Sequence, residues 1–327
     1  MVNHDEALAR APKPAWYTRC RLQQERWKGT TSTLPPPARA NGRCWVESRR
    51  QRHLVGPFPV CLPVEHASLN LLPSIRDEAL ARFARHDIEW HGGRELPSSH
   101  LLDSQVQCVN VLLSLAREPV LLLEWVRTIL PDARALVAIE DHRAVAFEWI
   151  GADDYLGEGR GRPRNRGRYV TSADALLVVE TPRGRTALLV EWKYTEHDTR
   201  AKPWIGDGGT DRRAVYRPHL VRSDGPLEVR VPIEAYFDEV GYQLLRLQLL
   251  AAAIVRAEEH GIDRALVVHV VPRGNRTLRE HVAPLVGAGP LVERWPSLLR
   301  DPGRVGYRCV DAEPLYSATP ELAERYA

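Results

Sequence analysis

Residues 174–194, with the sequence DALLVVETPRGRTALLVEWKY, contain two apolar runs separated by Thr181-Pro182-Arg183-Gly184. Leucine and valine runs of this length are typical of buried strands, and a Thr-Pro-Arg-Gly segment is typical of a turn. We therefore predict two antiparallel strands, 174–180 and 186–194, joined as a hairpin. With a turn near 182–184, residue 174 lies opposite about residue 192 of the partner strand.

The two ends of this hairpin carry the residues that point to chemistry. Asp174 opens the first strand, and Glu191 and Lys193 stand near the end of the second. Residues two apart on a strand share a face, so Glu191 and Lys193 can address one ligand. Two converging carboxylates repel unless a cation lies between them, and Mg²⁺ prefers such oxygen ligands. We therefore predict a magnesium site, which Mn²⁺ can also occupy, with an ammonium group beside it that orients a water molecule.

The pattern resembles the PD-(D/E)XK nuclease superfamily, the restriction-endonuclease-like fold, over about residues 99–272. The resemblance rests on Thr171-Ser172-Ala173-Asp174 and Glu191-Trp192-Lys193. It implies that Asp174 and Glu191 bind the metal, that the Trp192 backbone carbonyl adds a ligand and that Lys193 positions the nucleophile. Ala173 stands where the proline of the family name would be.

Some members of this superfamily use an upstream glutamate for a second metal ion. Glu148 is our candidate, with Asp103 and Gln105 as alternatives. Lys193 is one of only four lysines in the chain, which has 45 basic residues. The competing interpretation is an exposed hairpin on which Glu191 and Lys193 form a surface ion pair of little energetic value.

Hydrophobic periodicity predicts a mixed α/β fold, and the resemblance implies a restriction-endonuclease-like core with a mixed central sheet flanked by helices. We expect an irregular Arg- and Pro-rich region at 1–70, the core with a preceding helical layer at 71–272, and a C-terminal extension at 273–327 with short helices around Leu278 and Leu298. Ser74 and Ser98-Ser99 are the expected N-caps of the first two helices, and Gly261 is the expected end of the last. The expected helices are 75–86, 100–116, 120–130 and 238–261, and the expected strands are 143–150, 174–180, 186–194 and 265–271.

Basic residues precede the predicted site. Arginines alternate with Gly, Pro and Asn on a loop that could clamp a phosphate backbone or remain solvated; they are Arg160, Arg162, Arg164, Arg166 and Arg168. In the helix after the hairpin, Gln243 could act in catalysis and Arg246 could bind phosphate, or Gln243 could border an apolar helix. Gln105 and Asn110 could line the cleft, and His91 is more typical of a structural turn.

Bulk composition limits the class of protein. The net charge is only +3, so a nucleic-acid partner must be argued from local clustering. Five cysteines at irregular spacing favour a reduced, cytoplasmic protein without a membrane segment. Cys20, Cys44, Cys61 and His66 could hold zinc, but their spacing matches no compact zinc motif. P-loop, GxSxG and HExxH motifs are absent from the sequence.

The resemblance implies a metal-dependent nuclease, with DNA as the expected substrate, that acts in restriction, other defence or repair, and that could work as a homodimer. One alternative is a non-catalytic nucleic-acid-binding protein that retains the nuclease fold. Another is a phosphoester hydrolase that acts on small molecules, which the same metal chemistry permits.

Overall fold

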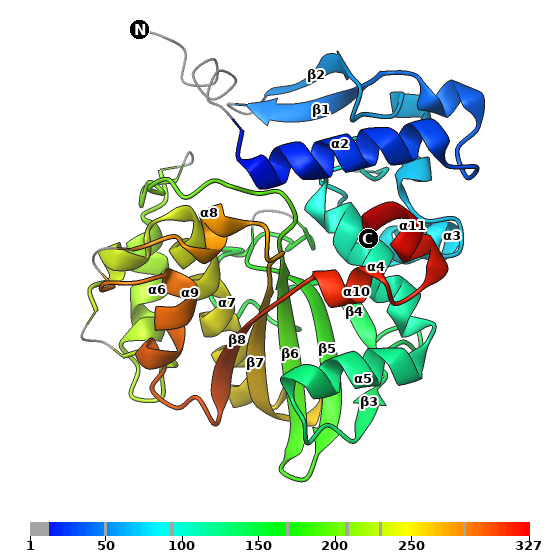
Figure 1. The fold of residues 1–327 in the computed structure, drawn as a ribbon. Helices are drawn as coiled ribbons and strands as arrows, with labels where there is room; N and C mark the ends of the chain where they lie inside the picture. Colours follow the sequence, from blue (N-terminus) through cyan, green and yellow to red (C-terminus); the bar gives the residue numbers. More distant parts are fainter. Residues whose placement is uncertain are drawn as a thin grey trace, which may run out of the picture.

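The computed structural model describes residues 13–48, 51–91, 95–167, 170–206, 209–228, 231–283 and 286–327. A six-stranded mixed sheet forms its centre, in the order β3-β5-β6-β7-β8, with β4 also paired to β5 (Figure 1). Strands β3, β4 and β6 run antiparallel to β5, whereas β6, β7 and β8 are parallel. The strands are β3 (Ala135–Val137), β4 (Val145–Trp149), β5 (Ala173–Thr181), β6 (Gly184–Trp192), β7 (Ile262–Val270) and β8 (Val305–Val310). The predicted hairpin and the mixed sheet are confirmed.

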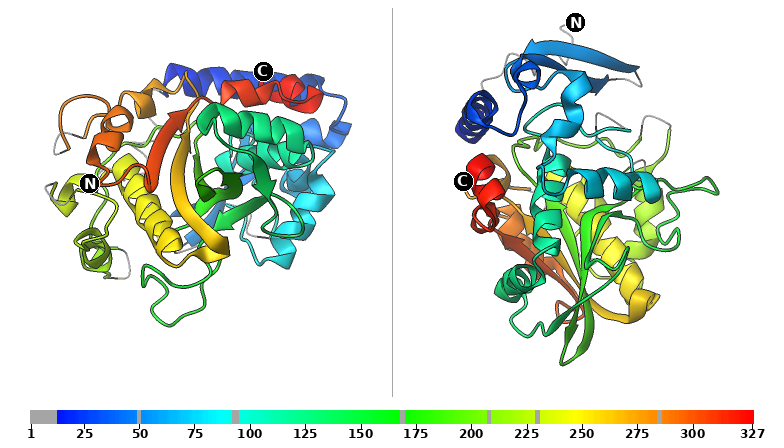
Figure 2. Two further views of the ribbon diagram at one scale, coloured as in Figure 1. Left: turned by 90° about the horizontal axis from the view of Figure 1, so that it is seen from below. Right: turned by 90° about the vertical axis from the view of Figure 1, so that its right-hand side faces the viewer.

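Helices cover both faces of this sheet (Figure 2). Alternate residues of β6 divide between two cores: Ala187 and Leu189 belong to the core that includes helix α7 (Glu239–Arg256). Leu188 and Val190 belong to the core that includes α4 (Ser104–Ala116) and α5 (Pro119–Ile129). A strand buried on both faces must be apolar throughout, which explains the continuous leucine and valine runs.

The helix ends differ from three predictions. The N-cap of α4 is Asp103, whose Oδ1 accepts from Val106 N at 2.9 Å, and not Ser98 or Ser99. Helix α3 (Arg76–Arg85) has Ile75 at its N-cap, and the Ser74 hydroxyl donates to Glu321 instead. Helix α7 ends at Arg256, and a separate 3₁₀ turn, η4 (Glu259–Gly261), contains Gly261. The α4 cap is therefore a local contact, whereas the Ser74 hydroxyl bonds to a residue that is distant in the chain.

The expectation of sparse regular structure near the N-terminus is wrong. The region contains a sixteen-residue helix, α2 (Ala15–Thr30), and a two-stranded hairpin of β1 (Gly42–Ser48) and β2 (Gln51–Phe58). Two 3₁₀ turns, η1 (Pro36–Arg39) and η2 (Val64–Asn70), follow α2 and β2. Helix α2 buries only four side chains, Cys20, Gln24, Trp27 and Lys28, so its apolar pattern was too weak to recognise.

The C-terminal residues add a strand and several short helices to the fold. The short helices expected around Leu278 and Leu298 are present as α8 (Arg276–Arg279) and η5 (Trp295–Leu298), but β8 was not foreseen. Helix α11 (Pro320–Tyr326) lies between α2 and α4 (Figure 1), where the buried Arg325 donates to Gln24 Oε1 and Asn70 O. The remaining elements are α6 (Arg212–Leu220), η3 (Ile233–Tyr236), α9 (Leu291–Arg294) and α10 (Glu313–Tyr316).

Within the described residues, no single helix has the length and apolar character needed to cross a membrane. Helices α4 and α5 satisfy that criterion only when taken together, and they are bent by 114° relative to each other.

Candidate active site

Three carboxylates lie level with one another on adjacent strands. The register pairs Phe147 with Ala175 and Trp149 with Ala173, so Glu148 of β4 stands level with Asp174 of β5. On the other side of β5, Ala175 pairs with Val190, which brings the next residue of β6, Glu191, level with Asp174. The sheet thus brings Glu148, Asp174 and Glu191 into one row, which we call the carboxylate row.

The backbone of β6 binds Asp174 directly. Trp192 N donates to Asp174 Oδ2 at 2.6 Å, whereas the next amide, Lys193 N, donates to Val270 O of β7. In an extended strand the N–H and C=O of one residue point to the same side. The Trp192 carbonyl therefore points towards Asp174, the position that the resemblance implies for a backbone ligand.

Lys193 lies against the carboxylate row. Its Nζ donates to Glu191 Oε1 at 2.6 Å, and both side chains are largely buried, with residue exposures of 9% and 6%. Burial alone would lower the pKa of Lys193, but the charges of Glu191, Glu196 and Asp174 raise it above its usual value. The neighbouring carboxylates therefore favour the protonated ammonium group, which suits a hydrogen-bond donor.

Like charges make the row unfavourable without a counterion. Dense surroundings raise the pKa of Asp174 although part of its surface is accessible, and the charges of Glu191 and Glu148 raise it further. Burial also raises the pKa of the Cys108 thiol on α4, and the same three carboxylates add to the effect. Burial and the neighbouring carboxylates therefore favour the protonated form of Asp174, and a cation bound in the row would favour its ionised form.

The upstream glutamate is held on both carboxylate oxygens. Gln105 Nε2 of α4 donates to Glu148 Oε1 and Ser172 Oγ donates to Oε2, each at 2.7 Å. Glu148 is 1% exposed and has a left-handed backbone with φ of 49°, a conformation that non-glycine residues adopt rarely and often at functional sites. Of the three upstream candidates, Glu148 stands in the row, Gln105 orients it, and Asp103 caps α4.

The donors present suit magnesium by their chemistry. The carboxylates and the Trp192 carbonyl are hard oxygen donors, and the charge of the row calls for a cation. In the described part of the chain, however, no group of three or more His, Cys, Asp or Glu side chains is arranged closely enough to hold a metal ion, neither here nor at the cysteines considered for zinc. Glu191 is bonded to Lys193 and Asp174 to a backbone amide, so metal binding requires these side chains to reorient.

Arg246 and Gln243 of α7 have different surroundings. Arg246 Nε donates to Thr171 Oγ1 at 2.8 Å and lies 3.6 Å from Glu158 Oε1, and the charge of Glu191 acts on it. Gln243 Nε2 donates to Glu239, one turn earlier on the same helix, at 3.2 Å. Arg246 therefore contacts the segment that leads into β5, whereas Gln243 bonds within its own helix.

The arginines of the 160–168 loop divide into two groups. Arg164 donates to four backbone carbonyls of residues 150–153, and Arg166 donates to Glu148 O and pairs with Glu140. These two side chains hold the loop together. Arg160 and Arg162 are exposed to solvent, and Arg168 lies outside the described residues.

The sequence interpretation missed one polar neighbour of the row. His269 of β7 pairs in register with Glu191 and is 1% exposed. Its Nδ1 contacts Tyr307 Oη at 3.2 Å, and burial lowers its pKa to about 3, with Lys193 and Arg279 adding to the effect. The signal was present, because His269 is the one polar residue in the apolar run ALVVHVV.

A mixed sheet whose hairpin presents Asp174 opposite Glu191 and Lys193, between flanking helices, defines a restriction-endonuclease-like protein. A model of the family described as Restriction Endonuclease associating with ARP matches residues 21–296, and the chain belongs to that family. Membership points to a nuclease-type function. No curated protein and no solved structure matches the sequence.

Proposed function

We propose that the protein is a magnesium-dependent endonuclease that hydrolyses phosphodiester bonds in DNA, of the restriction, defence or repair type. The observation that carries the proposal is the carboxylate row, with the protonated Lys193 bonded to one end of it. Family membership supports the nuclease class. The oxygen donors of the site support the metal, whereas DNA as the substrate and the roles of the residues follow from the resemblance to the PD-(D/E)XK superfamily.

Asp174, Glu191 and the Trp192 carbonyl would hold the ion, and Glu148 is placed to help bind a second one. A bound magnesium ion supplies stabilisation of negative charge on the phosphate and acidifies a water molecule. Lys193 can then donate a hydrogen bond to the attacking water and offset the charge that grows on the phosphate oxygens. Gln105 and Ser172 keep the Glu148 carboxylate oriented.

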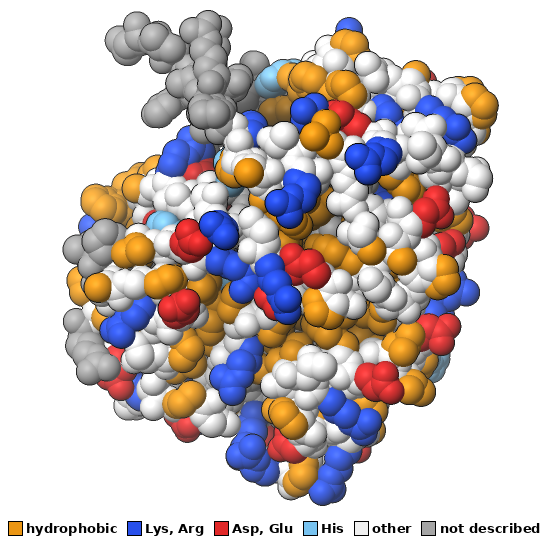
Figure 3. All heavy atoms as spheres, viewed as in Figure 1, with side chains coloured by type: hydrophobic (Ala, Val, Ile, Leu, Met, Phe, Trp, Pro, Cys, Tyr) orange, Lys and Arg blue, Asp and Glu red, His pale blue; other side chains and the backbone are white. Residues whose placement is uncertain are grey.

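Phosphate binding is assigned to Arg246 beside the row and to the exposed Arg160 and Arg162. Figure 3 shows Lys and Arg side chains on one face interleaved with Asp and Glu, not gathered into one continuous positive patch. Recognition of DNA is therefore expected to depend on a few positioned arginines more than on global charge.

The test incubates the purified protein with supercoiled plasmid and with single-stranded circular DNA, in EDTA, Mg²⁺ or Mn²⁺. We expect nicking by the wild type with either metal and none by Asp174→Asn or Glu191→Gln. Nicking that is equal in all three proteins would refute the site. DNA binding without nicking by any of them would instead favour a binding protein that retains the nuclease fold.

A further inference from the structure

A cavity of about 920 Å³ lies beside the carboxylate row. Two of its lining residues connect it to the row: His91 Nε2 is 3.6 Å from Glu148 Oε1, and Glu196 is one of the charges acting on Lys193. Neither these two residues nor the rest of the cavity has a role in the mechanism proposed above. Its size is that of a pocket for a small molecule or for one nucleotide with room to spare.

The lining combines aromatic rings with carboxylates. Trp45, Tyr17 and His197 supply rings, and Tyr17 and His197 meet edge to face with centroids 5.7 Å apart. Asp103 and Glu196 supply carboxylates that backbone amides hold in place, because Val106 N donates to Asp103 at 2.9 Å and Tyr194 N donates to Glu196 at 2.7 Å.

This lining suits a nucleobase better than a phosphate. A base stacks on aromatic rings, and the exocyclic amino groups of adenine, cytosine and guanine donate to carboxylates. The lining also holds three cations, each of which already has a partner: Lys13 lies over the Tyr17 ring, Arg52 lies over the Trp45 ring at 4.3 Å, and Arg200 pairs with Asp198. A phosphate placed in the cavity would also meet the carboxylates of Asp103 and Glu196. The phosphate attached to such a base would instead lie beside Lys193, at the neighbouring carboxylate row.

We propose that this cavity binds an unpaired nucleobase of the strand that is cut, next to the scissile phosphate. The inference rests on the proposed nuclease function and extends it to the form of the substrate: single-stranded DNA, or duplex DNA with a base turned out of the stack. It also gives the N-terminal segment a role, since Trp45 comes from β1 and Tyr17 from α2, which lie across one end of the sheet (Figure 1).

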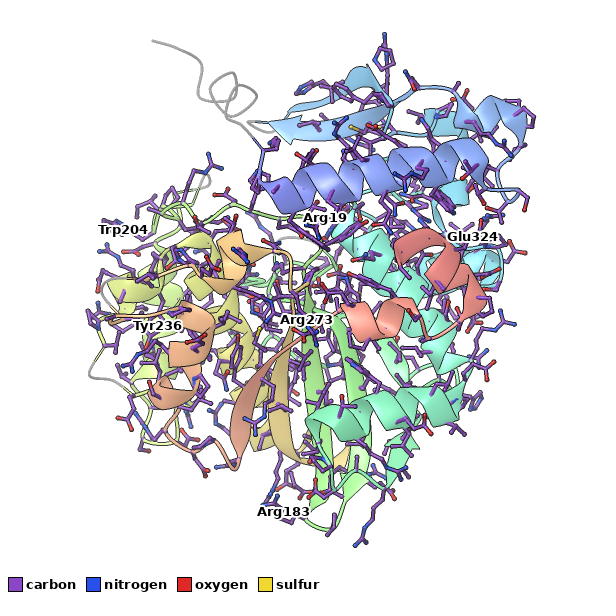
Figure 4. The ribbon with its side chains drawn as sticks, in the orientation of Figure 1. Arg19, Arg183, Trp204, Tyr236, Arg273 and Glu324 are labelled. Atoms are coloured by element: carbon purple, nitrogen blue, oxygen red, sulfur yellow. The ribbon has the colours of Figure 1, made fainter. Side chains whose placement is uncertain are left out.

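The test measures binding by the full-length protein in EDTA, so that metal-dependent cleavage does not interfere. Fluorescence anisotropy compares a labelled single strand with the same sequence as a duplex, and 2-aminopurine in the strand reports base stacking. Trp45→Ala should weaken single-strand binding by on the order of tenfold and remove the 2-aminopurine signal. The matched control is Trp204→Ala, because Trp204 is 44% exposed and does not line the cavity (Figure 4).

A second variant covers the case in which Trp45→Ala fails to fold. Glu196→Gln removes one negative charge and should weaken binding of oligo(dA) and oligo(dC) more than that of oligo(dT), because thymine has no exocyclic amino group. Equal binding of single strands by the wild type, Trp45→Ala and Glu196→Gln would overturn the proposal. Competition by free dAMP or dCMP as effective as that of the strand would also overturn it, in favour of a free nucleotide.

The two proposals fail in different ways. If the protein cleaves DNA but the cavity variants bind single strands normally, the cavity proposal is wrong and the nuclease proposal stands. If no metal supports cleavage while Trp45→Ala still weakens base binding, the cavity is a nucleobase site in a protein that does not cut DNA.

Discussion

Lys193 Nζ lies 2.6 Å from Glu191 Oε1, and the two residues stand two positions apart at the end of β6. The pair is largely buried and lies level with Asp174 and Glu148 on the neighbouring strands. An exposed pair of this kind would contribute little to stability or chemistry. Because this pair is buried beside the carboxylates of Asp174 and Glu148, charged groups are concentrated at the ends of neighbouring strands in the sheet.

Lys193→Ala should lower the cleavage rate by a factor on the order of 10² to 10⁴, because it removes the protonated donor that orients water and offsets phosphate charge. DNA binding in EDTA should change little. Single-turnover cleavage and anisotropy measure the two quantities. Lys202→Ala is the matched control, since Lys202 also pairs with a glutamate, Glu239. Loss of cleavage in both variants, or in neither, would contradict the role given to Lys193.

Mg²⁺ should raise the melting temperature of the wild type, because an ion bound only by the folded state stabilises it by mass action. Asp174→Asn should lose this shift and, without metal, should be at least as stable as the wild type, because it removes a carboxyl group whose ionisation burial and the neighbouring carboxylates oppose, while keeping an acceptor for Trp192 N. Thermal melts with EDTA and with about 10 mM Mg²⁺ measure this linkage. Asp301→Asn, an exposed aspartate that also accepts backbone amides, should keep the shift.

Arg160→Gln combined with Arg162→Gln should reduce the salt dependence of DNA binding. Each phosphate contact contributes about 0.9 to the slope of log K against log salt, so the double variant should lose up to about 2. Titrations over a range of NaCl concentrations give the slope. The control pair is Arg183→Gln with Arg276→Gln, two exposed arginines outside the loop. An unchanged slope in the loop variant would remove this reason for a polymeric substrate.

Stability should fall between pH 6.5 and pH 4 partly because of His100. Burial lowers the pKa of His100 to about 4, and its Nδ1 accepts from Leu102 N at 3.2 Å. The unfolded chain takes up a proton near pH 6.5 while the folded chain resists until about pH 4, so this contribution is complete above pH 6.5 and is lost as the pH falls.

His100→Asn keeps an acceptor but cannot take up this proton, so its stability should depend less on pH over that interval, by at most about 3 kcal/mol. Denaturant unfolding at several pH values tests this expectation. The control His53→Asn changes an exposed histidine in the same way. An acid sensitivity identical to that of the wild type would show that His100 does not contribute.

Arg325→Ala should destabilise the protein by about 3 kcal/mol or more, since it leaves buried acceptors without a donor. Arg325 is 1% exposed and donates to Asn70 O at 2.6 Å and to Gln24 Oε1 at 3.1 Å, which ties the chain end to α2. Urea unfolding gives the free energy. Arg276→Ala, at an 83% exposed side chain, should change it by less than about 0.5 kcal/mol. A similarly small effect at Arg325 would mean that α11 is not part of the cooperative unit.

The local sequence pattern was sufficient to predict the hairpin and the residues at its open end. Alternation along residues 186–194 puts Glu191 and Lys193 on one face, and the turn at 181–184 brings Asp174 opposite them, because strand pairing across a short turn follows directly from sequence. Glu148 was also predicted from the sequence, because it stands late in the preceding strand. Residues of α2 gave no such pattern, because most of its side chains are not buried.

The remaining parts of the site come from contacts between residues that are far apart in the chain. Gln105 reaches Glu148 across 43 positions and Arg246 reaches Thr171 across 75, and the register of β7 brings His269 beside Glu191. Such pairs depend on how helices pack on the sheet and on which distant strands become neighbours, and residue spacing encodes neither. Neighbouring positions in the chain and the two-residue repeat of a strand are therefore enough to predict Asp174, Glu191 and Lys193 from the sequence. Packing of distant segments alone creates the support of Glu148, the place of Arg246 and the cavity beneath α2 and β1.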